Sequence, residues 1–221
     1  MPLDFQPSSV TTNGLILEQK LLERYTPTEK ELEEAFTQNY RLVFDETALY
    51  IPIKKMMGQT LKKVTDGLML DLDEKGRGRF WIVEFELSSH DLESPVQAQV
   101  LGFVRHLDDE KTLRTLVRQV HEYIANLGSI EGEDEGWDIT FFEGQQKKMY
   151  PRPLEPYQYL DSIFHGKSGV MIVIDEVTAE LREVVASLAK LRPVRLVEFK
   201  AFRGNGKKAY TFSHADIGRR L

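Results

Sequence analysis

Some segments of the chain space their hydrophobic residues as a helix does and others as a strand does, and the order of these segments predicts a mixed α/β fold. After Thr26-Pro27-Thr28-Glu29, a capping residue followed by an acid, apolar residues recur at helical spacing, which predicts a first helix over 28–39. Three segments rich in branched and aromatic residues come next, with turn-forming residues between the second and third. They are expected to form an antiparallel meander of strands at Leu42–Ile53, Asp66–Leu72 and Arg79–Leu87.

The second half of the chain predicts two helices, an irregular insertion and a strand–helix–strand unit. Its continuous apolar run is typical of a strand covered on both faces, and a helix separates that strand from the next one. Such a connection implies parallel pairing. The expected elements, in order, are helices at Val96–Leu107 and Lys111–Asn126, the insertion at about 129–168, a strand at Gly169–Asp175, a helix at Thr178–Lys190, and paired strands at Val194–Phe202 and Lys208–Phe212.

Composition limits the class of protein. With 221 residues, 41% of them hydrophobic, the chain can bury one substantial core, so a single domain over 28–221 is expected after an N-terminal segment, 1–27. The absence of cysteine excludes disulfides, thiolate catalysis and zinc–thiolate sites. No apolar run reaches membrane-spanning length and no secretory signal is visible, so a cytoplasmic protein without a membrane partner is expected.

Charge is unevenly distributed along the chain. The formal net charge of −6 gives no general indication of nucleic-acid binding, but residues 181–221 hold ten Lys and Arg against three Asp and Glu. This basic segment is either a solvated surface or an electrostatic footprint for phosphates, and the sequence leaves both interpretations open.

Three carboxylates stand out against the apolar strands. A hairpin of the second and third strands would bring Asp66 beside Glu84, and side-chain alternation puts Glu86 on the same face as Glu84. Uncompensated charges in an apolar setting are costly, and a divalent cation with hard oxygen ligands, Mg²⁺ or Mn²⁺, is the natural compensation. Glu29, on the inward side of the first helix, could complete the cluster.

Each of these residues also has a purely structural interpretation. Asp66 could be a turn acid before Gly67, and Glu29 could simply favour the helix dipole in the first turn. Glu84 and Glu86 could form the polar face of an edge strand, although Phe80 and Ile82 lie in register with them, which a solvated face does not need.

The order of elements, with Asp at the start of the second strand and Glu-x-acid in the third, resembles the PD-(D/E)xK nuclease superfamily from about Thr28 to Phe212. The chain looks most similar to archaeal and bacterial DNA-repair and restriction-type members. The resemblance implies a restriction-endonuclease-like mixed sheet flanked by helices, with Asp66 and Glu84 as metal ligands. A Gln-x-x-x-aromatic pattern seen in several such families is matched by Gln99-Val100-Leu101-Gly102-Phe103, which makes Gln99 a candidate catalytic residue beside a plain surface glutamine.

One departure from the family bears on activity. The usual lysine of the motif is replaced by Glu86, which could act as base or bind a second ion. The expected function is therefore a strongly metal-dependent hydrolysis of DNA phosphodiester bonds in restriction, repair or phage defence, with a homodimer as a reasonable guess. The alternatives are a nuclease-fold module that binds nucleic acid or protein without cutting, and an acidic interaction domain with no nucleic-acid role.

Overall fold

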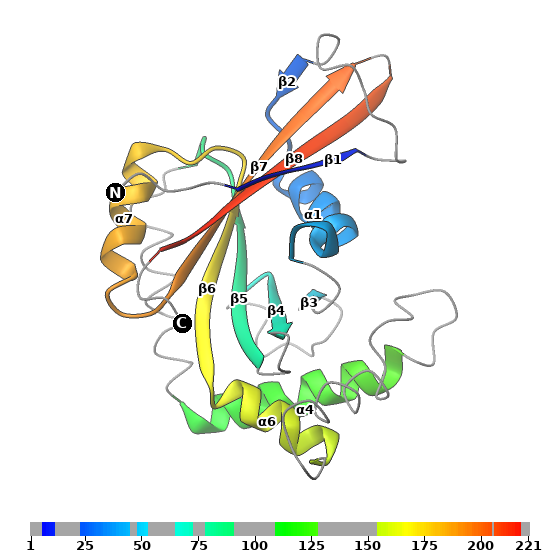
Figure 1. Cartoon of the computed structure of the whole chain (residues 1–221), viewed down its shortest axis with the longest axis vertical. Coiled ribbons are helices and arrows are strands. Elements are labelled where there is room, and N and C mark those ends of the chain that lie inside the picture. The colour runs from blue at the N-terminus through cyan, green and yellow to red at the C-terminus, as the bar shows by residue number, and fades with distance from the viewer. Residues whose placement is uncertain are drawn as a thin grey trace.

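The computed structural model describes residues 6–11, 23–44, 48–52, 65–72, 78–90, 109–127, 154–204 and 206–217, and its centre is a mixed sheet of eight strands (Figure 1). The strands are β1 (Gln6–Thr11), β2 (Glu23–Tyr25), β3 (Ala48–Pro52), β4 (Gly67–Leu72), β5 (Gly78–Glu86), β6 (Lys167–Ile174), β7 (Val194–Gly204) and β8 (Lys207–Ile217). The helices of the described part are α1 (Glu29–Phe44), α4 (Glu110–Leu127), α6 (Pro156–Phe164) and α7 (Ala179–Leu188).

The sheet combines the two halves that the sequence predicts. Its order is β1-β8-β7-β6-β5-β4-β3, with β2 paired to β7 outside this path. Strands β3, β4 and β5 form the expected antiparallel meander, and β5, β6 and β7 are parallel. Strand β8 returns antiparallel to β7 and carries β1 on its other side. The mixed α/β class, the meander and the strand–helix–strand unit are therefore confirmed.

Helices cover both faces of the sheet. On one face, α1 packs an aromatic core in which the ring of Phe36 contacts Tyr50, Phe85 and Phe212 at centroid distances of 5.4, 5.4 and 6.4 Å. On the opposite face, α4 and α6 cover the meander around Phe80, and α7 covers the parallel strands around Ile172. Figure 1 shows α4 and α6 crossing one end of the sheet while α7 flanks β6 and β7. No helix in the described part of the chain is long and apolar enough to cross a membrane.

Two element predictions are wrong. Helix α1 runs to Phe44 rather than ending near Asn39, because Tyr40, Val43 and Phe44 continue its buried stripe, so the first strand of the meander begins at Ala48 rather than Leu42. The expected irregular insertion at 129–168 contains helix α6. Pro156 occupies its first turn, where a missing N–H costs nothing, and the buried residues Tyr159, Leu160, Ile163 and Phe164 form one apolar face.

The segment 1–27, left unassigned by the sequence, contributes β1 and β2 to the sheet. The predicted helix at Val96–Leu107 and residues 129–153 of the insertion lie outside the described residues.

The start of α1 is fixed to the sheet by a cluster of polar side chains. Thr28 caps the helix by accepting a hydrogen bond from the backbone N–H of Glu31 at 3.2 Å, as the sequence predicts. The Glu31 carboxylate accepts hydrogen bonds from Tyr25, from Lys208 at 2.6 Å and from Tyr210 at 3.4 Å. Burial alone would raise the pKa of Glu31, but these partners lower it overall. The cluster sets the position of α1 over the strands that carry the candidate site.

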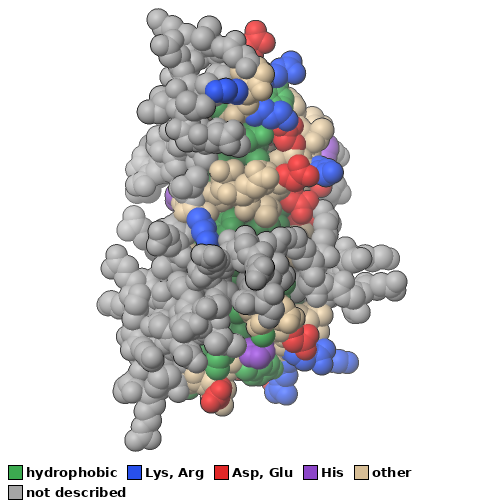
Figure 2. Space-filling view, turned by 90° about the vertical axis from the view of Figure 1, so that its right-hand side faces the viewer, with side chains coloured by type: hydrophobic (Ala, Val, Ile, Leu, Met, Phe, Trp, Pro, Cys, Tyr) green, Lys and Arg blue, Asp and Glu red, His purple; other side chains and the backbone are tan. Residues whose placement is uncertain are grey.

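Basic side chains of the segment 181–221 are distributed rather than gathered. Arg195 lies 3.5 Å from Asp71, Lys200 lies 2.9 Å from Glu198, and Lys208 reaches Glu31. On the face drawn in Figure 2, Lys and Arg side chains stand among Asp and Glu side chains. Among the described residues of this segment, the pairs of Lys200 and Lys208 favour the interpretation as an ordinary charged surface over a phosphate footprint, and Arg195 is buried.

Candidate functional site

Asp66 and Glu84 face each other at the junction of β4 and β5. The ladder pairs Gly67 with Val83, so the preceding Asp66 falls opposite the following Glu84. By alternation both side chains lie on the face that α4, α6 and α7 cover, on the same side as Leu68 and Ile82. Glu84 is only 6% exposed, and its carboxyl group is hydrogen-bonded to Asp66. The hairpin predicted from the sequence thus brings these two acids into contact.

The pair is electrostatically strained. Burial, followed by the negative charge of Asp66, raises the pKa of the Glu84 carboxyl to about 9, and a hydrogen bond from Thr65 only partly opposes this shift. Two carboxylates in contact inside a protein cannot both stay ionised without compensation. A proton on Glu84 or a cation beside the pair would relieve this repulsion.

Backbone contacts hold the pair in register. Asp66 Oδ2 accepts a hydrogen bond from the backbone N–H of Phe85 at 3.0 Å. Thr65 Oγ1 lies 2.8 Å from the carbonyl oxygen of Val83 and 3.1 Å from that of Gly67. Residues 65 and 66 are consequently tied to the end of β5 beyond the last regular pair of the ladder.

Tyr50 and Glu33 lie on the α1 side of the sheet, across from the pair, and the sequence did not predict that the charges of the pair act on Tyr50. Tyr50 is 2% exposed, and burial together with the charges of Glu33, Asp66 and Glu84 raises the pKa of its phenol well above the usual range. Among the described residues, the Tyr50 hydroxyl oxygen and Glu84 Oε1 are both buried without a hydrogen-bond partner. A tyrosine within an otherwise apolar strand was the available signal, because a buried hydroxyl calls for a polar partner.

Glu86 and His90 form a second contact next to the pair. Glu86 adds its negative charge to the field that raises the pKa of Glu84. Its Oε2 lies 3.2 Å from His90 Nδ1, and the Glu86 side chain is 13% exposed against 46% for His90. The sequence placed Glu86 on the same face as Glu84, and the contact of Glu86 with His90 was not predicted.

The remaining candidates fare differently. Glu29 is exposed in the first turn of α1, and Glu33, one turn further on, is the helix acid whose charge acts on Tyr50. The role of Glu29 as a ligand stays a prediction, and Gln99 lies outside the described residues.

A divalent cation fits the chemistry of the pair. Within the described part of the chain, no group of three or more Asp, Glu, His or Cys side chains is positioned to hold a metal ion. Magnesium sites commonly use one or two carboxylates and leave the other positions to water, which two acids suffice to provide. Asp71, the buried acid at the other end of β4, is compensated by protein cations instead of a metal ion: its carboxylate lies 3.0 Å from Arg79 and 3.5 Å from Arg195. Glu84 instead meets the charges of two further acids.

No family model, curated protein or solved structure matches the chain.

Proposed function

We propose that this chain is a metal-dependent deoxyribonuclease with a restriction-endonuclease-like fold of the PD-(D/E)xK type. The observation that carries the proposal is the Asp66–Glu84 pair, in which burial and then the charge of Asp66 raise the pKa of Glu84 to about 9. Such a shift at a buried, specifically paired acid is typical of functional sites. The order of the meander and the parallel unit supports the same assignment.

Asp66 and Glu84 are the ligands of this proposal, with Mg²⁺ or Mn²⁺ as the cation. A divalent ion held there would neutralise the non-bridging oxygens of a phosphodiester and assist its leaving oxygen. The hydrogen bond from the Phe85 N–H orients Asp66, and Thr65 braces the same turn against β5.

Glu86 and His90 handle the proton in this proposal. The family lysine is absent, and the imidazole of His90 lies 3.2 Å from Glu86, in reach of a proton exchanged with it. A water attacking phosphorus must lose a proton to a positioned base, and an acid–imidazole pair is suited to accept it. His90 is the more exposed partner and therefore the one that meets solvent and substrate.

A second candidate is a nuclease-fold module that binds nucleic acid or a protein without cutting. The replacement of the motif lysine by Glu86 favours it, because the positive charge that would stabilise the phosphorane-like state is then missing from that position. Binding without cleavage at any divalent metal distinguishes this candidate from the first.

The test is a cleavage assay on single- and double-stranded DNA with Mg²⁺, Mn²⁺ or EDTA. We expect metal-dependent nicking or cutting by the parent protein. Asp66→Ala and Glu84→Ala should abolish it while circular dichroism shows an unchanged fold. Glu183→Ala, an exposed acid on α7, is the matched control and should cut normally. Cleavage that persists in both site variants would overturn the assignment.

A further inference from the structure

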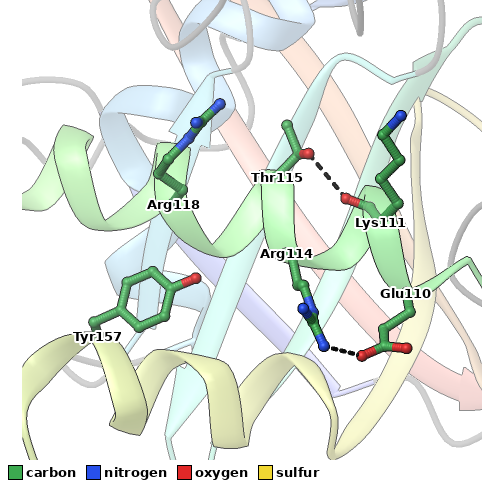
Figure 3. Close-up of a pocket in the computed structure, with 6 residues that line it drawn as sticks. All are labelled: Glu110, Lys111, Arg114, Thr115, Arg118 and Tyr157. Atoms are coloured by element: carbon green, nitrogen blue, oxygen red, sulfur yellow. Dashed lines mark hydrogen bonds and ion pairs between the residues drawn. The ribbon is translucent and has the colours of Figure 1, made fainter.

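A hollow of about 470 Å³ lies between α4 and α6, apart from the carboxylate pair (Figure 3). Three cations and one anion line it, giving a local excess of positive charge in a chain whose formal net charge is −6. The lining residues are Glu110, Lys111, Arg114, Thr115, Arg118 and Tyr157.

The cations form a stripe along one side of α4. Lys111, Arg114 and Arg118 recur at helical spacing, which puts them on neighbouring turns, and the stripe spans roughly 10 Å of the helix axis. Arg114 is ion-paired with Glu110 at the edge of the hollow. Lys111 and Arg118 are exposed, and Figure 3 shows both side chains extending from the same side of the helix. Their charges are thus presented at two separate points of one surface.

An exposed aromatic ring completes the hollow. Tyr157, in the first turn of α6, is 38% exposed and one of two large hydrophobic side chains of the described part that are exposed. Its ring packs edge-on against His121 of α4, with centroids 5.7 Å apart and an interplanar angle of 69°. The imidazole holds the phenol ring in place while leaving part of it open to solvent. A fixed ring beside two cations is the combination that single-stranded nucleic-acid sites use for bases and phosphates.

We propose that this hollow binds a single-stranded nucleic-acid segment, with Lys111 and Arg118 contacting successive phosphates and Tyr157 stacking on an unpaired base. The choice of nucleic acid over another anion rests on the proposed function, which gains here a surface that holds substrate outside the carboxylate pair. An acidic peptide would also match the cations, but it would leave the open ring of Tyr157 without a stacking partner. The ring therefore favours a strand with free bases.

The experiment measures binding of a short fluorescent single-stranded DNA by anisotropy, in EDTA and over a range of salt concentrations. Lys111→Gln combined with Arg118→Gln should weaken binding and reduce the slope of log affinity against log salt by about 1.4, since two phosphate contacts are lost. Tyr157→Leu should weaken binding roughly ten-fold at unchanged charge. Tyr157→Phe should bind like the parent, because it keeps the ring. Lys190→Gln combined with Lys207→Gln, at exposed positions on other elements, is the charge-matched control and should change the slope less.

Any of the following results would overturn the proposal. The first is no binding by the parent at low salt, and the second is an equal loss in the control pair, which would show a diffuse effect of net charge. The third is an unchanged affinity of Tyr157→Leu, or displacement of the strand by polyglutamate at equal charge, which would point to an acidic protein partner. Because the assay contains no divalent metal, it succeeds or fails independently of cleavage. If the hollow binds the strand but the protein cleaves no DNA, only the nuclease assignment is wrong.

Discussion

The ring of Tyr50 lies directly against the backbone of Gly67. A Cβ atom at position 67 would fall 2.3 Å from Tyr50 Cε2 and 2.5 Å from its hydroxyl oxygen, well inside van der Waals contact. Gly67 follows Asp66 and opens β4, and its missing side chain leaves room for the buried ring of Tyr50 on the α1 face of the sheet. The glycine is needed for this close approach rather than for an unusual backbone angle.

Gly67→Ala should therefore lower the free energy of unfolding by about 1–3 kcal/mol, because the ring must move within a packed core. Urea denaturation of the single and double variants at positions 67 and 50 tests whether the clash with the Tyr50 ring causes this loss of stability. In a Tyr50→Ala background the cost of Gly67→Ala should shrink, since the clash has been removed. Gly206→Ala is the control: its φ of +70° makes it costly with nothing within 4 Å, so its effect should be the same in both backgrounds. An undiminished cost of Gly67→Ala would contradict the packing.

The free energy of unfolding should fall as the pH rises from about 4.5 to about 9. Glu84 has a folded-state pKa of about 9 against an ordinary value of 4.5, so between these values the native state binds a proton that the unfolded state has lost. The stabilisation is full below pH 4.5 and decreases by at most about 1.4 kcal/mol per pH unit up to the folded-state value. Glu84→Gln cannot titrate and should flatten the profile in that window. A profile of Glu84→Gln that still parallels the parent would assign the pH dependence to other groups.

Magnesium should stabilise the protein more at pH 8 than at pH 6, because binding requires Glu84 to release its proton. At ten times the dissociation constant the gain is about 1.4 kcal/mol, visible as a rise in Tm. Asp66→Ala and Glu84→Gln should show no such rise. A metal-induced gain of the same size in both variants would place the cation elsewhere.

Tyr50→Phe separates the hydroxyl from the ring. In EDTA the variant should be at least as stable as the parent, because the lost hydroxyl has no partner among the described residues and its removal relieves up to about 1 kcal/mol of desolvation. With Mg²⁺ its stability gain should equal the parent's, because the hydroxyl lies on the α1 face of the sheet, across from the pair; a smaller gain in the variant would contradict this placement. Thermal melts with and without metal make both comparisons. Equal metal-induced gains would show that the hydroxyl takes no part in the site.

Arg195 is expected to be the costliest charged side chain to remove. It is 6% exposed, lies 3.5 Å from Asp71 Oδ2, and its guanidinium stacks over the ring of Trp81 at 4.5 Å. Arg195→Met should lower the free energy of unfolding by about 3–5 kcal/mol, because it removes one of the cations that compensate the buried Asp71. Lys200→Met breaks the more exposed pair with Glu198 and should cost about 1 kcal/mol or less. Chemical denaturation compares the two variants, and similar losses would contradict the assignment.

The elements with uninterrupted patterns could be predicted from the sequence. The apolar run of β6 and the hairpin of β4 and β5 have the expected type and nearly the expected bounds, and the register of that hairpin brings Asp66 to Glu84. Strand β1 could not be predicted, because Gln6–Thr11 is a short, largely polar segment. It forms a strand by pairing with β8. Tertiary pairing of this kind overrides local propensity.

The sequence predicted the two central acids of the site but not the residues around them. Asp66 and Glu84 are joined by local hairpin geometry, which a sequence pattern contains. The charges of Glu33 and of the pair act on Tyr50 because Gly67 lets the tyrosine ring lie against the start of β4, under α1. This arrangement depends on packing between elements distant in sequence. His90 touches Glu86 through the turn after β5, whose conformation the residue pattern does not specify.

The register of β5 also has a consequence for the order of folding. Asp66 meets Glu84 across a loop of fewer than twenty residues, whereas Glu84 pairs with Ile172 on β6, far along the chain. Closing the shorter loop costs less chain entropy, and local contacts form sooner than distant ones. We therefore expect the two acids to meet when the hairpin forms, while it is still partly hydrated and before the parallel strands pair. Protonation of Glu84 at mildly acidic pH should therefore increase the refolding rate constant. Repulsion between the two carboxylates then limits the rate of folding as well as shaping the site.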